Sequence, residues 1–325
     1  MLATNFPDPF LLRTERRFLA FSTQSAGVHV QVAASPDLLT WTLLSRDGGQ
    51  LDAMPTLPAW AHPDRPDVWA PEVIRVGSGW RLYFSARHRT ERNAREAKPC
   101  IGVAAASAPE GPYTPAATPL ICEGLREGVI DPSPFRDGLR LFLLFKRDGN
   151  CCGGGSNLLV QQLTRDGLRT VGPRRDTGVR NDLPWKGEVV EAPTLVRHRG
   201  RRLLFYSANG YGGPSYAVGY AVCRTAIGPC RDAPDNPVLA SRQAHPPRLI
   251  GPGHQSLLQW KGRTFIAYHA WSELPDGRQG PARYMHVSEV VWDGDKPVVV
   301  GLRRPLPTPL RDQKAGPAPP ASMRR

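Results

Sequence analysis

The sequence has no run of about 18 apolar residues, the length that a helix needs to cross a membrane. It also begins without the charged and then apolar segment that is typical of an export signal. These two absences predict a protein without a membrane partner. As written it is expected in the cytoplasm, and outside the cell if the chain is the mature form of a longer precursor.

Lysine is scarce, because only six of the 42 basic residues are lysines, and the arginines are spread over every segment. A formal net charge of +13 would indicate a nucleic-acid partner if the basic residues gathered on one periodic face. Scattered arginine is instead typical of a biased composition, and we expect no nucleic-acid partner. An acidic polysaccharide such as pectin is a weaker alternative.

The six cysteines include no C-x-x-C pair and no Cys/His ligand spacing, which argues against structural zinc and iron–sulfur clusters. Two pairs, Cys100–Cys122 and Cys223–Cys230, are candidate disulfides and would imply an oxidising compartment. A G-x-S-x-G elbow is also lacking, which argues against a serine hydrolase.

A fivefold internal repeat is what the sequence does contain, together with 32 glycines and 34 prolines that favour short strands and many turns. Each repeat begins with a short apolar strand that carries a polar residue, and a strongly apolar strand and then an alternating strand follow it. The first strands are expected at Asn5–Phe10, Val68–Ile74, Val129–Phe135, Val189–Val196 and Gly251–Leu258.

Second strands that are apolar at nearly every position suit sheets covered on both faces, as in packed propeller blades. The repeat therefore predicts an all-β fold, a five-bladed β-propeller with four-stranded antiparallel blades around a central channel. We assign residues 1–305 to the propeller. The basic Pro/Ala-rich residues 306–325 read as a disordered tail.

Five polar side chains occupy the first strands in register, at successive differences in residue number of 64, 59, 60 and 63. If these strands are innermost, all five side chains converge on the channel. They are Asp8, Glu72, Asp131, Glu191 and His254.

Three of the carboxyl groups among these side chains fit what glycoside hydrolysis needs. In that reaction one carboxyl group protonates the departing oxygen and another activates water. Burial and mutual repulsion would raise the pKa of one carboxyl and leave another ionised. The candidates are Asp8, Asp131 and Glu191.

Several short motifs in fixed order resemble glycoside hydrolase family 43, the five-bladed propeller arabinanases, arabinofuranosidases and β-xylosidases. They are DPF from Asp8, WAPEV from Trp69, IDPSPF from Ile130, EAP from Glu191, GPGH from Gly251, YHAW from Tyr268 and the R-x-M-H-V…VWDGDKPVV stretch from Arg283. Each motif alone is weak, but their order and spacing together are specific.

The resemblance implies an inverting mechanism and a role for each acid. Asp8 would be the general base that activates water, and Glu191 would be the general acid. Asp131 would modulate the pKa of Glu191 and hold it in position. No cofactor is required for this chemistry.

The resemblance also implies three residues around the acids. His254 would sit on the channel axis, where the family often holds a calcium ion or a water cluster, and would reach calcium through water. Arg283 would hydrogen-bond the innermost sugar, and Trp69 would supply apolar surface against its ring.

Some of these residues could instead have purely structural roles. Trp69 and Trp271 are alternatively core residues between blades, and Arg283 is alternatively a blade-bridging ion pair. We expect Glu72 to be structural and His269 to be a satisfied buried histidine.

The expected reaction is exo-acting release of L-arabinofuranose from arabinan, arabinoxylan or a derived oligosaccharide. The phrases LPAWA from Leu57, CIGVA from Cys100 and KRDGN from Lys146 look most like the arabinan-directed part of the family. Long connections at 47–67 and 87–99 would wall a pocket for exo cleavage. A β-xylosidase and an endo-arabinanase are alternatives, and a catalytically silent carbohydrate-binding propeller is the alternative of another class. The sequence leaves the oligomeric state open.

Overall fold

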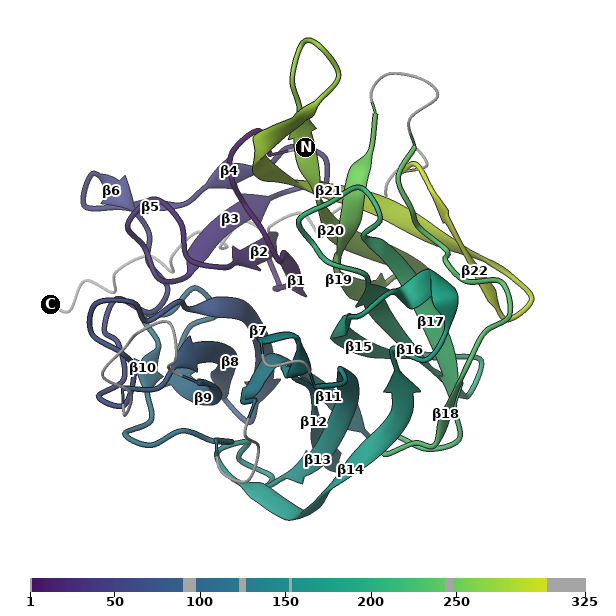
Figure 1. Cartoon of the computed structure of the whole chain (residues 1–325). Coiled ribbons are helices and arrows are strands. Elements are labelled where there is room, and N and C mark those ends of the chain that lie inside the picture. The colour runs from purple at the N-terminus through teal and green to yellow at the C-terminus, as the bar shows by residue number, and fades with distance from the viewer. Residues whose placement is uncertain (1, 90–97, 123–126, 152–153, 243–247, 303–325) are drawn as a thin grey trace, which may run out of the picture.

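The computed structural model describes residues 2–89, 98–122, 127–151, 154–242 and 248–302, and it shows a five-bladed β-propeller. Five four-stranded sheets stand in a ring around a central channel (Figure 1). All pairings between neighbouring strands of the blades are antiparallel. The predicted fold is confirmed, whereas the predicted tail at residues 306–325 lies outside the described residues.

Each blade is continuous in sequence, so its strands follow one another from the channel outward. Blade 1 contains β1 (Phe10–Arg13), β2 (Phe18–Ser22), β3 (Gln31–Ser35) and β4 (Thr42–Leu43), and blade 2 contains β7 (Trp69–Val76), β8 (Gly79–Arg87), β9 (Pro99–Ala106) and β10 (Thr114–Pro115). Blade 3 contains β11 (Val129–Asp137), β12 (Arg140–Arg147), β13 (Asn157–Leu163) and β14 (Thr170–Arg180), and blade 4 contains β15 (Val190–His198), β16 (Arg201–Ala208), β17 (Ala217–Cys223) and β18 (Cys230–Asp232). Blade 5 contains β19 (Ile250–Trp260), β20 (Arg263–Glu273), β21 (Gln279–Asp293) and β22 (Lys296–Val300).

Short elements lie outside the blade strands. The hairpin of β5 (Ser45–Arg46) and β6 (Gly49–Gln50) connects blades 1 and 2, and the 3-10 turn η2 (Pro184–Lys186) connects blades 3 and 4. The 3-10 turn η1 (Gly149–Cys151) lies within blade 3, between β12 and β13. Among the described residues, no helix has the length and apolarity needed to span a membrane.

Apolar side chains fill the gaps between neighbouring blades and form the core. Between blades 1 and 2, for example, Phe21 of β2 packs with Leu82 and Phe84 of β8, and all three side chains are completely buried. The second strands are therefore covered on both faces, which is why they are apolar at nearly every position.

The N-terminal segment closes the ring. Leu2 and Phe6 donate backbone hydrogen bonds to β21, with N···O distances of 3.4 Å to Met285 and 2.8 Å to Arg283. Because Phe6 also packs against β20 and β21, the first blade is tied to the fifth. Asp8 therefore stands beside blade 5, where its contact His269 is 261 positions away in sequence.

One residue near the channel in each blade has a positive φ, between 48° and 58°. A non-glycine residue pays about 1 kcal/mol for this conformation, so five of them at equivalent places need compensation. The strand ladders shift register at this point in blades 2 to 5. The five residues are Asp8, Ala70, Asp131, Ala192 and His254, at differences in residue number of 62, 61, 61 and 62.

The predicted register needs correction at two positions. Glu72 lies two residues after the positive-φ position of its blade, and Glu191 lies one residue before it. The first strand of blade 1 also begins at Phe10 rather than Asn5, because the turn at Asp8 interrupts extended backbone.

A ring of hydrogen bonds between blades offsets the conformational cost of the five positive-φ residues. The backbone N–H of each positive-φ residue donates to a side chain of the preceding blade, so every blade is fastened to its neighbour at the channel. The pairs are Asp8 to His269 at 3.2 Å, Ala70 to Thr23 at 2.9 Å, Asp131 to Ser85 at 3.0 Å, Ala192 to Asp131 at 2.9 Å and His254 to Ser207 at 2.8 Å.

Both candidate disulfides are present. Cys100–Cys122 links β9 to the segment after β10, and Cys223–Cys230 links β17 to β18 at the outer edge of blade 4.

Candidate active site

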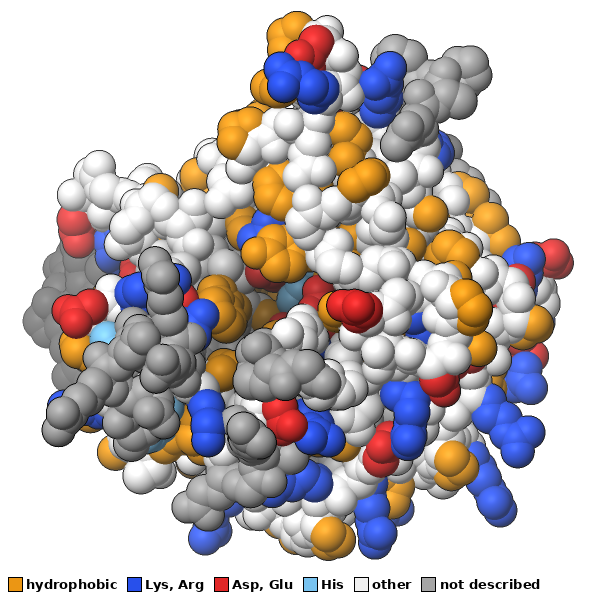
Figure 2. All heavy atoms as spheres, viewed as in Figure 1, with side chains coloured by type: hydrophobic (Ala, Val, Ile, Leu, Met, Phe, Trp, Pro, Cys, Tyr) orange, Lys and Arg blue, Asp and Glu red, His pale blue; other side chains and the backbone are white. Residues whose placement is uncertain are grey.

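A cavity of about 480 Å³ opens at the ends of the inner strands where the positive-φ residues lie. Figure 2 shows a hollow near the middle of the visible face, with acidic and histidine side chains inside it and hydrophobic side chains at its rim. All six predicted site residues line this one cavity: Asp8, Trp69, Asp131, Glu191, His254 and Arg283. The structure therefore brings together the residues that the sequence separates by up to 275 positions.

Asp8 is held by side chains from two blades, the first and the fifth. Thr23 Oγ1 donates to Asp8 Oδ2 at 2.5 Å. Arg283 Nη1 and His254 Nδ1 lie 3.2 and 3.3 Å from Asp8 Oδ1. Burial opposes ionisation of this carboxyl, but the charges of His254 and Arg283 outweigh it and hold its pKa well below the usual value. Asp8 is therefore ionised, as a base that accepts a proton from water must be.

His269 belongs to the surroundings of Asp8. Its Nδ1 lies 3.2 Å from both the backbone N and Oδ1 of Asp8, and burial lowers its pKa to about 4, so the ring is neutral. Its Nε2 is buried without a partner among the described residues. The expectation of a satisfied histidine is therefore wrong for one ring nitrogen, although the ring itself stacks on Tyr216 with 5.7 Å between the ring centres.

Glu191 lies at the start of blade 4, and both of its carboxyl oxygens have donors. Lys146 Nζ donates to Oε2 at 2.8 Å, and the Tyr216 hydroxyl donates to Oε1 at 2.7 Å. Burial raises the pKa of Glu191, but the positive charge of Lys146 outweighs burial and lowers it. Lys146 fixes both the orientation and the charge of this carboxyl.

Asp131 is connected to Glu191 through the backbone, because its Oδ2 accepts a hydrogen bond from the N–H of Ala192 at 2.9 Å. Burial, together with the negative charge of Glu191, raises the pKa of Asp131 to about 6. The two carboxyls interact strongly and titrate as a pair. In the free site the charges favour a proton on Asp131 and ionised Glu191.

Lys146 and Tyr216 are site residues that we did not predict as such. Lys146 occupies the position of β12 that a serine or histidine occupies in the other second strands, and this departure from the repeat is the signal that would have identified it. The equivalent residues are Ser22, Ser85, Ser207 and His269. Tyr216 offers no such signal, because it lies at the end of a loop.

Arg283 is sandwiched between two aromatic rings beside Asp8. Its guanidinium carbon lies 4.8 Å from the ring centre of Tyr211 and 5.7 Å from that of Trp271. The indole Nε1 of Trp271 donates to the backbone O of Tyr211 at 2.8 Å and pins the loop that carries this tyrosine. Trp271 is half-buried here and is not the inter-blade core residue that we considered.

Trp69 is half-buried and lies on the opposite side of the channel in blade 2. The guanidinium carbon of Arg87 lies 5.2 Å from the centre of its ring, and Arg87 Nε donates to Asp67 Oδ2 at 2.5 Å. Arg65 completes this wall. The connection at residues 47–67 thus contributes to the cavity as predicted, whereas most of the connection at 87–99 lies outside the described residues.

Glu72 lies beside Asp131 rather than in the cavity lining. Burial raises its pKa well above the usual value, with a smaller contribution from the charge of Asp131. A neutral carboxyl at this position agrees with the structural role that we expected.

His254 faces the three acids, and its positive charge would lower the pKa of each of them. Within the described part of the chain, no group of three or more His, Cys, Asp or Glu side chains could hold a metal ion directly. Arginine and histidine nitrogens already face Asp8 Oδ1, which does not favour a cation at that oxygen. A calcium ion reached through water stays a prediction.

The sequence profile described as "Glycosyl hydrolases family 43" matches residues 1–297, nearly all of the part that forms the blades. The resemblance seen in the sequence motifs is thus confirmed for the family.

Curated relatives carry different activities in their names. The chain is 24% identical over 322 residues to "Xylan 1,3-beta-xylosidase" of Vibrio sp., covering 92% of this chain and 56% of that protein. It is 27% identical over 255 residues to "Xylosidase/arabinosidase 43A" of Humicola insolens, covering 71% and 74%. It is 32% identical over 117 residues to "Extracellular endo-alpha-(1->5)-L-arabinanase" of Thermotoga petrophila, covering 33% and 22%. The chain thus spans about half of the Vibrio protein and about a fifth of the Thermotoga protein.

Solved structures share the whole architecture. A thermostable family-43 glycoside hydrolase superposes with a TM-score of 0.79 at 27% identity, covering 94% of this chain and 96% of that one. An endo-1,4-beta-xylanase from Bacteroides thetaiotaomicron superposes with a TM-score of 0.73 at 26% identity, covering 93% and 97%.

Proposed function

Because the chain belongs to the glycosyl hydrolases of family 43, we propose that it is an inverting, exo-acting α-L-arabinofuranosidase. Its substrates are arabinan, arabinoxylan or derived oligosaccharides, from which it releases terminal L-arabinofuranose. The observation that carries the proposal is one cavity with an ionised Asp8 on one side and the coupled carboxyls of Asp131 and Glu191 on the other.

In this mechanism Asp8 takes a proton from a water molecule as its oxygen attacks the anomeric carbon. Glu191 gives a proton to the departing glycosidic oxygen, and the bond to the leaving group breaks as the bond to water forms. Side chains from blades 1 and 5 support the role of Asp8, because they hold its charge and its orientation before substrate enters.

The proton that Glu191 donates must come from the pair that it forms with Asp131. Lys146 keeps Glu191 ionised in the free site, and Asp131 holds a proton with a pKa of about 6. Asp131 is thus a positioning residue that accepts the N–H of Ala192 and supplies the pair with its proton. Glu191, with Lys146 and Tyr216 on its two oxygens, is held toward the cavity.

The walls of the cavity support exo action on a terminal sugar. Trp69 and Arg87 stand on the blade 2 side, and Tyr211 and Arg283 stand between blades 4 and 5. Arg283 would hydrogen-bond the innermost sugar, and Trp69 would pack against its ring. Arabinose is favoured by the sequence phrases that resemble arabinan-directed members.

A β-xylosidase is the second candidate, because two of the curated relatives have xylosidase in their names. The test compares hydrolysis of p-nitrophenyl α-L-arabinofuranoside and p-nitrophenyl β-D-xylopyranoside, with Glu191→Ala as the control. We expect turnover of the arabinoside, lost in the control, and proton NMR should first show the inverted anomer of the released sugar.

Other outcomes have definite meanings. Preference for the xyloside would replace arabinofuranosidase by β-xylosidase, and a retained anomer would overturn the inverting mechanism. Turnover of long arabinan alone would indicate an endo-arabinanase. Sugar binding without turnover of any of these substrates would indicate the silent binding propeller.

A further inference from the structure

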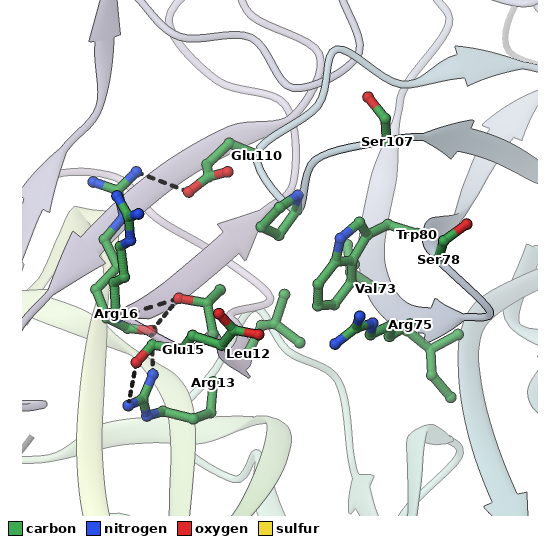
Figure 3. A pocket seen from close by; sticks show the side chains of 14 residues that line it. Leu12, Arg13, Glu15, Arg16, Val73, Arg75, Ser78, Trp80, Ser107 and Glu110 are labelled. Carbon is green, nitrogen blue, oxygen red and sulfur yellow. Dashed lines mark hydrogen bonds and ion pairs between the residues drawn. The ribbon is translucent and has the colours of Figure 1, made fainter. Parts of the chain in front are cut away.

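A second cavity lies at the other ends of the inner strands. Its volume is about 900 Å³, against about 480 Å³ for the cavity that holds the acids. The turn between β1 and β2, the end of β7 with the start of β8, and the residues after β9 line it (Figure 3). Asp8 precedes β1 and Glu191 begins β15, so the acids are at the opposite ends of these strands. A sugar in this cavity is therefore not the one that is cleaved.

One wall of the cavity is apolar and fixed. Leu12 of blade 1 and Trp80 of blade 2 both pack against the core between these blades, which holds their side chains in place. Figure 3 shows the Trp80 indole facing the open space, with Val73 beside it. A half-buried indole on a fixed apolar floor offers the flat surface on which the face of a sugar ring packs.

The polar lining of the cavity is rich in arginine. Arg17 Nη2 pairs with Glu110 Oε1 at 2.8 Å, and Arg13 Nη2 donates to the backbone O of Glu15 at 3.0 Å. Four arginines and two glutamates line the cavity, so its formal charge is positive.

Two of these arginines, Arg16 and Arg75, offer their guanidinium groups to a ligand. Both side chains are exposed, and no acceptor for either guanidinium is found in the described part of the chain. They come from opposite walls, Arg16 from the turn of blade 1 and Arg75 from β7 of blade 2, so they can bind separate carboxylates of one acidic polymer. Each guanidinium can bind a carboxylate with two parallel hydrogen bonds.

We propose that this cavity, lined by Trp80, Arg16 and Arg75, is a non-catalytic binding site for a carboxylate-bearing segment of polysaccharide, a run of uronic acid residues. The indole takes the face of one sugar ring, and the two guanidinium groups take the carboxylates. The proposal rests on the proposed function in one respect, namely that the ligand is a polysaccharide. The positive formal charge of the cavity lining favours an acidic polymer over a neutral one.

A second binding site for the polymer would help the enzyme to act on it. A chain held at this end of the propeller raises the effective concentration of its other branches around the active site. Removal of the site would thus weaken action on an acidic branched polymer and leave short neutral substrates unaffected.

The test measures binding of polygalacturonate by isothermal titration calorimetry at about 0.15 M salt, where surface charges farther apart than about 8 Å are screened. The variant Arg16→Ser/Arg75→Ser removes both free charges. The matched control Arg140→Ser/Arg165→Ser removes two exposed arginines of blade 3, one at the start of β12 and one in the turn after β13, and neither has a side-chain partner among the described residues. Neutral linear arabinan is the comparison ligand.

We expect the wild-type protein to bind polygalacturonate, Arg16→Ser/Arg75→Ser to bind it about tenfold or more weakly, and the control to bind it as the wild type does. Trp80→Ala should also weaken binding, with unfolding temperature as the check on folding. Equal weakening in both double variants would show nonspecific charge attraction and overturn the site. So would the absence of polygalacturonate binding.

Hydrolysis of the aryl arabinoside separates this proposal from the proposed function. The variant Arg16→Ser/Arg75→Ser should keep the wild-type rate on that substrate, because the cavity lies away from the acids. A wild-type protein that binds polygalacturonate through these arginines but hydrolyses no arabinoside would refute the function and leave the site standing. Normal hydrolysis with unchanged binding in the variant would refute the site alone.

Discussion

Lys146 Nζ donates to Glu191 Oε2 at 2.8 Å, although the side chain of this lysine has no exposed surface. A buried cation beside the proposed general acid decides how that acid is charged, since burial alone would raise the pKa of Glu191 and the lysine lowers it. Asp148 shares the lysine at 3.4 Å, so three charged groups depend on one another. The activity and the stability of the protein should both respond to this contact.

Lys146→Met should raise the pKa of Glu191, because the carboxyl loses its positive neighbour and keeps its burial. Loss of activity at high pH follows deprotonation of the acid, so the alkaline limb of kcat should move upward by about one pH unit or more. The variant should also lose about 3–5 kcal/mol of stability, because Glu191 and Asp148 are left without their cation. The exposed Lys98→Met is the control. An unchanged alkaline limb in a folded Lys146→Met protein would contradict this account.

Asp8→Asn should lower kcat by about 10²–10⁴ and leave KM nearly unchanged, because the amide keeps the shape of the side chain but accepts no proton from water. Steady-state kinetics on the preferred aryl glycoside measure both constants. The unfolding temperature should stay close to that of the wild type. A variant with more than a tenth of the wild-type kcat would remove Asp8 from the role of base.

Asp131→Asn should change how stability depends on pH. The folded pKa of about 6 exceeds the ordinary value of 3.8, so binding of a proton to Asp131 stabilises the fold fully below about pH 4. This contribution is lost as pH rises through about 6, and asparagine has no such loss. The free energy of unfolding of the variant, measured by urea denaturation, should therefore gain about 1–3 kcal/mol relative to wild type between pH 4 and pH 7. A difference independent of pH would show that the pKa of Asp131 is not raised.

Tyr211→Ala should reduce kcat/KM by about 3- to 30-fold, because the ring that covers the guanidinium of Arg283 contributes about 0.5–2 kcal/mol to its position. Tyr211→Phe keeps the ring and should retain nearly the full value. The comparison isolates the aromatic face from the hydroxyl group. Equal losses in both variants would show that the hydroxyl, rather than the stacking, matters.

Cys223→Ser/Cys230→Ser should cost about 2 kcal/mol of stability, because the disulfide closes a short loop between β17 and β18 in the unfolded chain. Urea denaturation with and without a reducing agent measures the effect. The wild type should lose stability on reduction. The variant should lose less, since it no longer contains Cys223–Cys230. Activity should be kept, because this edge of blade 4 faces away from the cavity.

The sequence by itself determined the number of blades and which blades carry the acidic residues of the site. A repeat of about 60 residues is a local property, since each unit carries its own strands and turns, and the polar residue of each first strand must then face the axis. Asp8, Asp131 and His254 were placed correctly in this way. Glu72 and Glu191 were aligned one or two residues from the true register, because a positive-φ turn at Ala70 and Ala192 leaves no mark in the residue type.

Only the tertiary structure decided which other side chains lie in contact with the catalytic acids and with Arg283. Lys146, Tyr216 and Tyr211 reach Glu191 or Arg283 from blades 3 and 4, and of the three only Lys146 left a sign in the sequence, as a departure from the repeat. The direction of each pKa shift was also undecided, because it depends on burial and on charges that neighbouring blades bring within a few ångströms. The resemblance assigned a proton to Glu191, whereas the packing of Lys146 against it moves that proton toward Asp131.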